Sequence, residues 1–335
     1  MSPSIPSHSP TLPRVVAFGG GTGLPVLLEG LRELDGDLVT AVVTVADDGG
    51  SSGRLRRELG MPPPGDVRNC LVAMASRRRL AEVFSYRFEE GAELRDHSVG
   101  NLIIAALVDM AGGFAEGVEQ AGRFLRVKGR VLPAATESLT LVIEDIDGTV
   151  TRGESTVRAT RAIARVSIEP QGAQAPAGVA EAIARADVVV LAPGSLFTST
   201  IPALLGAGVA EALAAFGGPV VYASNVMTQP GETTGFSVSD HVRAIADHVG
   251  AAVTDVVVHA EALPEASIRW YEAVGAAPVA IDREATERLG TRVWERAVLA
   301  ETTAPGVRHD PGRLAEAVLE VAATARSHSG LSRPS

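Results

Sequence analysis

The sequence predicts an α/β protein with a Rossmann-like, doubly wound and mainly parallel sheet, covered by helices on both faces. Three observations support this prediction. Short, fully apolar runs alternate with segments whose apolar residues recur at helical spacing. Several of the apolar runs end in Gly, Ser, Asn or Asp, where such sheets place their ligand-binding loops. The chain has 335 residues and is 46% hydrophobic, which suits one large globular α/β domain.

Each expected element follows from this alternation. Residues 139–155 alternate apolar and polar side chains around Asp147-Gly148, a turn pair typical of hairpins, so we expect a small β-hairpin excursion there. Asp310 and Pro311 are typical of a helix N-cap and first helical residue. Fully apolar runs predict buried strands over residues 14–20, 38–47, 186–195, 218–226 and 254–263. Helical spacing predicts helices over residues 25–34, 67–76, 99–111 and 310–327.

We expect these elements to form a single α/β domain over residues 14–327. A disordered Pro- and Ser-rich arm over residues 1–13 is expected before it, and a flexible tail over residues 328–335 after it. Cys70 is the only cysteine, which excludes an internal disulfide and a cysteine-rich metal site. A single cysteine is also typical of proteins of the reducing cytoplasm.

Charge and hydropathy exclude several classes of function. The formal net charge is −10, so the chain offers no basic footprint for nucleic acid or for an anionic membrane. No apolar run approaches the ~18 residues of a transmembrane helix, and the first residues lack the basic and apolar regions of a signal peptide. We therefore expect a cytoplasmic protein without nucleic acid partners and without membrane insertion.

The first candidate binding loop is "GGGTG", residues 19–23, between an expected strand and an expected helix. Glycines at such a turn let backbone N–H groups approach a phosphate. The spacing is not GxGxxG, because Leu24 stands at the third glycine position, and it is not a Walker A loop. A tight turn without a ligand is the alternative. The candidate ligand-binding residues of this loop are Gly20, Gly21, Thr22 and Gly23.

The second candidate loop is "ADDGGSSGRLRRELG", in which we expect Asp47 to end the second strand. A single acid here would indicate a ribose contact, whereas Asp47 and Asp48 together with the polar loop indicate a site for Mg²⁺ or hydroxyl groups. Ser51 and Ser52 belong to the same candidate site. Because Asp, Ser and Gly also form turns, a simple helix cap is the alternative.

A third loop, "MPPPGDVRNC", stiffens the backbone with prolines before an expected helix. Asp66 is expected to be the N-cap of that helix. Arg68 falls in the first turn, where a cation opposes the helix dipole, so we expect a ligand or an acidic partner for its guanidinium.

Further polar residues follow other apolar runs or precede an apolar helix. Gly194 and Ser195 come directly after a buried strand, and Asn225 ends the next one. Thr228 opens a long polar loop, and Asn101 stands at the start of an apolar helix. No Ser-His-Asp order, HExxH motif or cysteine cluster marks a catalytic centre.

Together these motifs resemble the gluconeogenesis factor family, the YvcK-like branch of the 2-phospho-L-lactate transferase (CofD-like) superfamily. The resemblance extends over nearly the whole core of the chain, from about Val15 to about Pro311. The motifs that carry it are "GGGTGLPVLLEGL", "VTVADDGGSSGRLR", "PPPGDVRNCL", "HSVGNLIIAAL", "LPAATESLTL", "APGSLFTSTIP" and "NVMTQPGETTGFSVSDH".

The resemblance implies a cytoplasmic protein linked to growth on gluconeogenic carbon sources, to cell shape and to the supply of peptidoglycan precursors. It also implies binding of UDP-sugars, UDP-N-acetylglucosamine in particular. Carried onto this chain, the phosphate and nucleotide contacts would come from residues 20–23, Gly194, Ser195 and Asn225, and Arg308 would contact the sugar nucleotide. The transferase branch uses a similar glycine loop and acidic pair, with Mg²⁺, to move a phospholactyl group onto a deazaflavin. This chain departs from that branch after the acids, at "GGSSGRLRRELG".

Three hypotheses for the function remain open at this point. The first is a UDP-sugar-binding regulatory protein, which acts on an unidentified protein of cell-wall or carbon metabolism and forms a homo-oligomer. The second is a Mg²⁺-dependent transferase in which Asp47 and Asp48 hold the metal, because phosphoryl-type transfer needs little covalent help from the protein. The third is an NAD-dependent oxidoreductase, which rests only on the strand, glycines and helix at the start of the domain.

Overall fold

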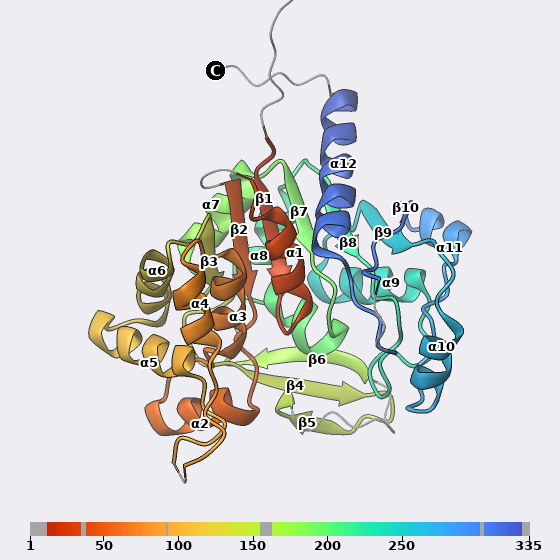
Figure 1. The fold of residues 1–335 in the computed structure, drawn as a ribbon. Helices are drawn as coiled ribbons and strands as arrows, with labels where there is room; N and C mark the ends of the chain where they lie inside the picture. The colour runs from red at the N-terminus through yellow and green to blue at the C-terminus, as the bar shows by residue number, and fades with distance from the viewer. Residues whose placement is uncertain (1–11, 35–37, 92, 155–162, 302–304, 330–335) are drawn as a thin grey trace, which may run out of the picture.

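The central layer of the structure is a sheet of seven described strands, each parallel to its neighbours (Figure 1). The computed structural model describes residues 12–34, 38–91, 93–154, 163–301 and 305–329. The strand order is β10-β9-β8-β7-β1-β2-β3, which confirms the predicted doubly wound α/β fold. The strands are β1 (Val15–Gly19), β2 (Val39–Val43), β3 (Arg130–Pro133), β7 (Val188–Leu191), β8 (Val220–Ala223), β9 (Asp255–His259) and β10 (Arg292–Arg296).

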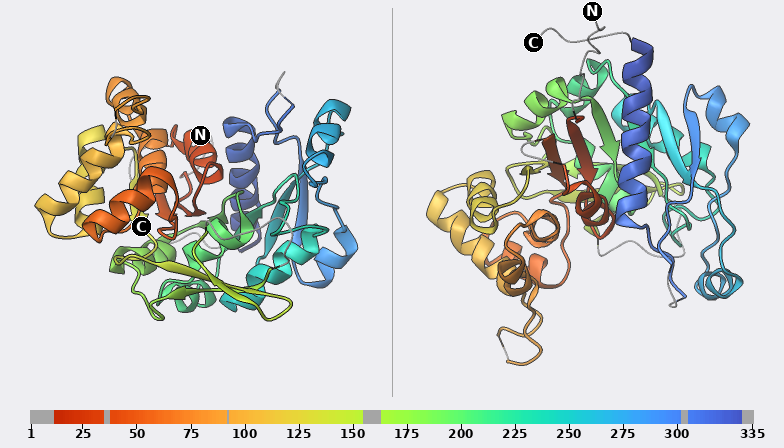
Figure 2. Two further views of the ribbon diagram at one scale, coloured as in Figure 1. Left: turned by 90° about the horizontal axis from the view of Figure 1, so that it is seen from below. Right: turned by 45° about the horizontal axis from the view of Figure 1, so that its top comes forward.

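The inner strands are continuous apolar runs because helices cover both faces of the sheet. Every residue of β1, β2, β7 and β8 is buried. Helices α1 (Gly23–Leu31), α3 (Gly65–Met74) and α12 (Pro311–Ser329) pack together on one face, and α8 (Val209–Ala214) and α9 (Val238–Val249) lie on the other (Figure 2). This burial supplies the main favourable term for folding.

Two features of the main sheet differ from the sequence prediction. The second strand ends at Val43 and not at Asp47, because β1 turns away after Gly19 and leaves the later residues without a ladder partner. Thr44 makes the last backbone contact, to the carbonyl of Gly19. Strands β3 and β10 were not predicted. Both are edge strands that begin with an exposed arginine, and neither has a long apolar run.

A second, antiparallel sheet lies across the carboxyl ends of the central strands (Figure 1). Strands β4 (Thr140–Asp145) and β5 (Val150–Arg152) confirm the predicted hairpin. The hairpin is part of a three-stranded sheet, since β6 (Ile163–Glu169) pairs with the other side of β4. This sheet brings Glu154, just after β5, toward the carboxyl edge of the main sheet.

The predicted helices occur with small shifts of their ends, and α12 begins as expected, because Asp310 Oδ1 accepts the N–H of Arg313 at 2.9 Å. Residues 1–11 of the expected arm and residues 330–335 of the expected tail lie outside the described residues. Within the described ranges, no helix combines the length and the apolar character needed to cross a bilayer. The remaining helices are α2 (Gly50–Leu59), α4 (Arg78–Ser85), α5 (Val99–Ala111), α6 (Phe114–Leu125), α7 (Ala177–Arg185), α10 (Glu265–Glu272), α11 (Arg283–Arg288) and the short turns η3 (Leu196–Thr200) and η4 (Pro202–Leu204).

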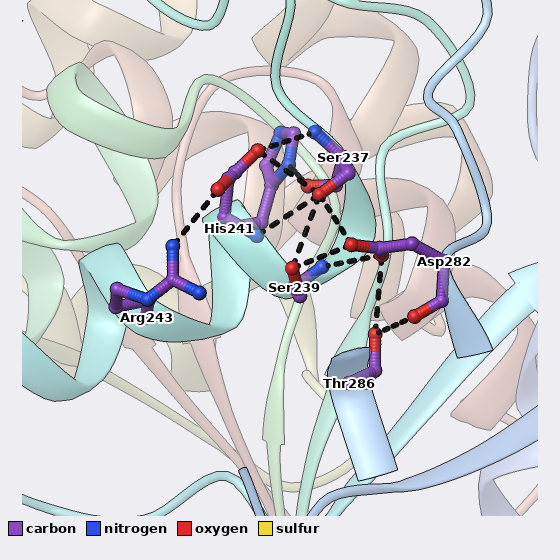
Figure 3. A network of polar contacts seen from close by, with 7 residues as sticks. Ser237, Ser239, His241, Arg243, Asp282 and Thr286 are labelled. Atoms are coloured by element: carbon purple, nitrogen blue, oxygen red, sulfur yellow. Dashed lines mark hydrogen bonds and ion pairs between the residues drawn. The ribbon is translucent and has the colours of Figure 1, made fainter. Parts of the chain in front are cut away.

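A polar network fixes the start of α9, which follows the long polar loop after β8 (Figure 3). Ser237 caps the helix in a capping box with Asp240. Asp282, at the start of α11, accepts hydrogen bonds from the Ser239 backbone N–H at 3.0 Å and from the hydroxyls of Ser237 and Ser239 at 2.8 and 2.6 Å. Although burial opposes its ionisation, these donors hold the pKa of Asp282 below its ordinary value. The network therefore anchors the end of the loop that carries Glu232.

Candidate functional site

The candidate site lies where the strand order reverses, between the loops that follow β1 and β7. From β1 the chain winds outward through β2 to β3, and from β7 it winds in the opposite direction to β10. The two loops diverge from neighbouring strands at the carboxyl edge, which is where open α/β sheets bind ligands. The two loops are also in direct contact. A Cβ added to Gly23 would lie only 1.7 Å from the carbonyl oxygen of Pro193. No side chain other than hydrogen fits at residue 23 without moving this backbone.

In the glycine loop after β1, neighbouring atoms leave no space for a side chain at Gly20 and Gly23, whereas Gly21 has space around its Cβ position. A Cβ on Gly20 would lie 2.4 Å from Thr44 Cγ2 and 2.6 Å from Asp66 Oδ2. Gly21 has a φ of +57° and has only Ser199 Oγ, at 3.7 Å, near its Cβ position. Thr22 is exposed and its side chain makes no capping hydrogen bond to α1. The amides at the start of α1 are therefore left without a cap from Thr22, as an anion site at a helix N-terminus requires.

Asp66 does not cap α3 as the sequence predicted. Pro64 occupies the N-cap position, and Asp66 falls in the first turn of α3. From there its Oδ2 accepts the backbone N–H of Gly21 at 2.7 Å, so one carboxylate joins α3 to the glycine loop. Burial raises the pKa of Asp66 to about 6; the Gly21 N–H and Arg68 lower it, while Asp47 raises it further.

The acidic loop packs against the start of α3. Asp47 Oδ1 accepts the N–H of Gly49 at 2.8 Å, which closes a turn before α2. A Cβ on Gly65 would lie 2.3 Å from Ser52 Oγ and 3.6 Å from Asp47 Oδ2. The structure thus brings Asp47 and Ser52 beside the segment that carries Asp66. Asp48 follows directly in the same loop.

Ser51 and Asn101 meet at a buried hydrogen-bonded cluster. Ser51 Oγ lies 2.9 Å from His97 Nδ1 and accepts the side-chain N–H of Asn101 at 3.0 Å. Burial, together with Arg54, lowers the pKa of His97, so its ring is neutral at neutral pH. Among the described residues, Asn101 Oδ1 has no hydrogen-bond partner although it is buried. The cluster joins the start of α2 to the start of α5 and leaves the Asn101 Oδ1 acceptor without a hydrogen bond from the described residues.

Arg68 is a buried cation with little compensation. Its side chain donates to Asn69 Oδ1 at 2.6 Å, and the residue is 8% exposed. Burial and the neighbouring Arg87 lower the pKa of Arg68 to about 10, and Asp66 opposes this shift. A buried guanidinium is expensive unless an anion pairs with it. That the Arg68 guanidinium pairs with a ligand or an acidic partner stays a prediction.

At the loop after β7, residues that were predicted to contact the ligand form hydrogen bonds with one another or with neighbouring side chains. The Gly194 N–H donates to Asn225 Oδ1 at 2.9 Å, and Asn225 Nδ2 donates to the Gly194 carbonyl at 2.7 Å. The Ser195 hydroxyl donates to Glu232 and accepts from the Thr198 hydroxyl at 2.6 Å. A phosphate at Gly194 would therefore have to replace Asn225 Oδ1 as the acceptor.

Two glutamates that the sequence reasoning missed lie at the same edge. Burial raises the pKa of Glu154 to about 8, and Asp47, Asp66 and Glu232 raise it further, while Thr198 lowers it. Burial also raises the pKa of Glu232, against the hydrogen bond from Ser195. Glu154 is thus protonated at neutral pH, which reduces the negative charge that an anionic ligand would meet. Glu232 belongs to the polar loop that Thr228 opens, but nothing in that loop singled out this residue, and no local motif pointed to Glu154.

Two predicted contacts lie further from this centre. The N–H of Thr228 donates to the Ala277 carbonyl at 2.7 Å, and its hydroxyl accepts the Ala277 N–H at 2.9 Å. Arg308 is exposed, and its neighbour His309 is held near the end of β8 by the Ser224 backbone. Thr228 thus supports its loop, and Arg308 stands at the rim of the carboxyl edge.

For metals, the donor set within the described residues is limited. No group of three or more His, Cys, Asp or Glu side chains in those ranges is arranged to hold a metal ion. Asp47 and Asp48 are hard oxygen donors of the type that Mg²⁺ prefers, but a ligand phosphate and water would have to complete the shell.

Comparison with known proteins places the chain in a family. The family model described as 2-phospho-L-lactate transferase CofD matches residues 15–299, so the chain belongs to this family. The gluconeogenesis factor of Halalkalibacterium halodurans is 45% identical over 310 residues, covering 91% of this chain and 95% of that protein. The gluconeogenesis factor of Bacillus subtilis is 41% identical over 312 residues, covering 92% and 98%. A crystal structure of a Bacillus halodurans protein matches with a TM-score of 0.88 at 44% identity, covering 92% of this chain and 100% of that one.

These relatives confirm the resemblance seen in the sequence motifs. The sequence similarity extends over nearly the full length of two proteins called gluconeogenesis factor.

The raised pKa of Asp66 predicts a pH-dependent stability. Between pH 4 and pH 6 the unfolded chain loses the Asp66 proton while the folded chain keeps it, so stability falls as pH rises. A shift of roughly two pKa units corresponds to about 3 kcal/mol. Asp66→Asn keeps an acceptor for Gly21 but cannot ionise. Urea unfolding should show the variant gaining about 3 kcal/mol relative to wild type from pH 4 to pH 7.

Asp109→Asn, at an exposed position of α5, is the matched control. A difference between Asp66→Asn and wild type that stays constant over this pH range would contradict the assignment, as would the same change in the control.

Proposed function

We propose that the chain is a regulatory protein that binds a UDP-sugar of the UDP-N-acetylglucosamine type. The observation that carries the proposal is the glycine loop at the switch point, whose helix start lacks a side-chain cap while the buried Arg68 lacks a full counter-charge. A diphosphate matches both features, because it accepts backbone N–H groups and pairs with a guanidinium. The family membership and the name gluconeogenesis factor of two relatives support it.

In this proposal the ligand lies across both halves of the carboxyl edge. The amides of residues 20–23 and Arg68 receive the diphosphate, for which the Gly21 N–H exchanges its contact to Asp66 Oδ2. Gly194, Ser195 and Asn225 form the wall beside it, where Asn225 exchanges its contact to Gly194 for the base or ribose. Asn101 Oδ1 offers a buried acceptor for a ligand hydroxyl, and Arg308 reaches the ligand from the rim.

The biological role follows the resemblance. The protein would act in the cytoplasm and report UDP-sugar supply to a partner protein of cell-wall or central carbon metabolism. This would link gluconeogenic growth to cell shape and peptidoglycan precursors. A sensor needs no nucleophile, and the Ser51 hydroxyl beside His97 is only 5% exposed and held by its neighbours. Homo-oligomer formation belongs to the same proposal.

Ligand binding is tested by thermal unfolding with UDP-N-acetylglucosamine, UDP-glucose, GDP and NAD, each with and without Mg²⁺. A ligand at ~100 times its dissociation constant adds about 2.7 kcal/mol and should raise the melting temperature by several degrees. We expect this with UDP-sugars alone, and the sugar nucleotide should be recovered unchanged. Arg68→Gln should raise the dissociation constant by about 10- to 100-fold, since a charge-assisted contact is lost.

The matched control is Arg288→Gln, which removes an exposed guanidinium from α11. No shift with any UDP-sugar, or equal binding by wild type and Arg68→Gln, would refute the proposal. A shift with NAD alone would instead support the oxidoreductase.

A second candidate function is a Mg²⁺-dependent transferase of a phospholactyl-like group. The observation that favours it is the gathering of Asp47, Asp66, Glu154 and Glu232 around the glycine loop, together with the family to which the chain belongs. Asp47 and Asp48 would hold the metal, which when bound would neutralise phosphate charge. Arg68 and the loop amides would orient the donor, and the buried cluster would exclude water.

The transferase predicts a different response to mutation. Asp48→Asn should abolish turnover of a nucleotide-linked substrate with Mg²⁺ and leave the melting temperature within a few degrees of wild type, because the change is isosteric and Asp48 is only partly buried. Turnover is measured by chromatography of the products, with Asp109→Asn as the control. Turnover that persists in Asp48→Asn would remove Asp48 from the mechanism.

A further inference from the structure

A cavity of about 230 Å³ opens at the amino edge of the sheet, at the opposite ends of β1 and β2 from the glycine loop. Its apolar floor comes from the first residues of β1 and from the segment that enters β2. The lining residues are Arg14, Val15, Val16, Leu38, Thr40, Arg130, Ala182 and Arg185. The residues proposed above for the sugar nucleotide are absent from this lining.

Three exposed arginines, Arg14, Arg130 and Arg185, are among the lining residues, and the nearby carboxylates of Asp187 and Glu181 are already engaged. Asp187 Oδ2 accepts the Arg14 backbone N–H at 2.8 Å and pairs with Arg326 at 3.0 Å. Glu181 lies 3.9 Å from Arg185, and both side chains are exposed, so this pair contributes little. Within the described parts of the chain, no carboxylate lies within ion-pair distance of Arg14 or Arg130. The cavity is therefore a positive spot on a chain whose formal net charge is −10.

The position of Arg130 places its positive charge beside the start of a helix. A Cβ on Gly178 would lie 2.8 Å from Arg130 Nη2, so the guanidinium packs against the first turn of α7. The start of a helix carries a partial positive charge, which repels a cation. Gly178 has no side chain, which leaves space for the Arg130 guanidinium beside the helix. An anion in the cavity would pair with these arginines and offset the unfavourable placement of Arg130 at the helix start.

The size of the cavity limits what it can hold. Ligand pockets for drug-sized molecules measure roughly 300–1,000 Å³, so about 230 Å³ is too small for a nucleotide sugar. We infer that this cavity is a binding site for a small, compact anion with two or more phosphate or carboxylate groups. The guanidinium groups pair with its charges, the Thr40 hydroxyl donates a hydrogen bond, and the Val15, Val16 and Leu38 side chains contact its carbon or phosphorus framework.

The test is isothermal titration calorimetry of the full chain with inorganic pyrophosphate and, separately, with citrate. At least one should bind saturably with a dissociation constant near or below ~1 mM, and Arg130→Gln should weaken that binding about 10-fold or more. Binding of pyrophosphate alone identifies a phosphate site, and binding of citrate alone identifies a carboxylate site. Arg288→Gln, which removes one exposed charge from α11, should bind as wild type does.

Three results would overturn the inference. These are no saturable heat with either anion up to about 10 mM, well above the expected range; equal binding by wild type and Arg130→Gln; and an equal loss in Arg288→Gln. Binding of pyrophosphate that Arg68→Gln weakens and Arg130→Gln leaves intact would place the anion at the glycine loop and also overturn it. Arg130→Gln should bind UDP-N-acetylglucosamine as wild type does, so this inference and the proposed function fail separately.

Discussion

The close packing of the loop after β1 against the loop after β7 is the constraint on which the rest of the site depends. Strand order reverses between these two strands, so their loops must diverge from one point at the carboxyl edge. Gly23 touches the Pro193 carbonyl with no space for a Cβ, and Gly20 lies against Thr44 and Asp66. These approaches hold the start of α1 where its amides face the same edge as Arg68 and Asn225.

Electrostatics at this edge explain how an acidic chain can receive an anion. Asp47, Asp66, Glu154 and Glu232 lie near one another, and burial raises the pKa of the last three. Glu154 is protonated at neutral pH and Arg68 is a buried cation, so the edge is less negative than its four acidic residues alone would make it. In the proposals above, the cation and the loop amides would receive a diphosphate, and Asp47 and Asp48 would hold a metal that arrives with it.

The fold was predictable from the sequence, whereas the contacts within the site were predictable only in part. Inner strands such as β7 are continuous apolar runs because both of their faces are covered, and such runs are visible in the sequence. Edge strand β10 begins and ends with an arginine, has no continuous apolar run and gives no such signal. Gly21, Arg68 and Asn225 stood out by position, but the Asp66 contact to Gly21 joins residues 45 apart, and Glu232 reaches Ser195 across 37. Contacts of this kind depend on the tertiary arrangement of strands and not on local spacing.

The central claim is that one diphosphate-containing ligand contacts both loops at the switch point. Hydrogen–deuterium exchange with and without saturating UDP-N-acetylglucosamine tests it most directly, because exchange reports protection of individual backbone segments. The account predicts that the peptides spanning residues 19–24 and 193–198 both slow, while those of α10 and α11 exchange as before. Slowing confined to segments away from the carboxyl edge, or no change in either loop, would contradict it.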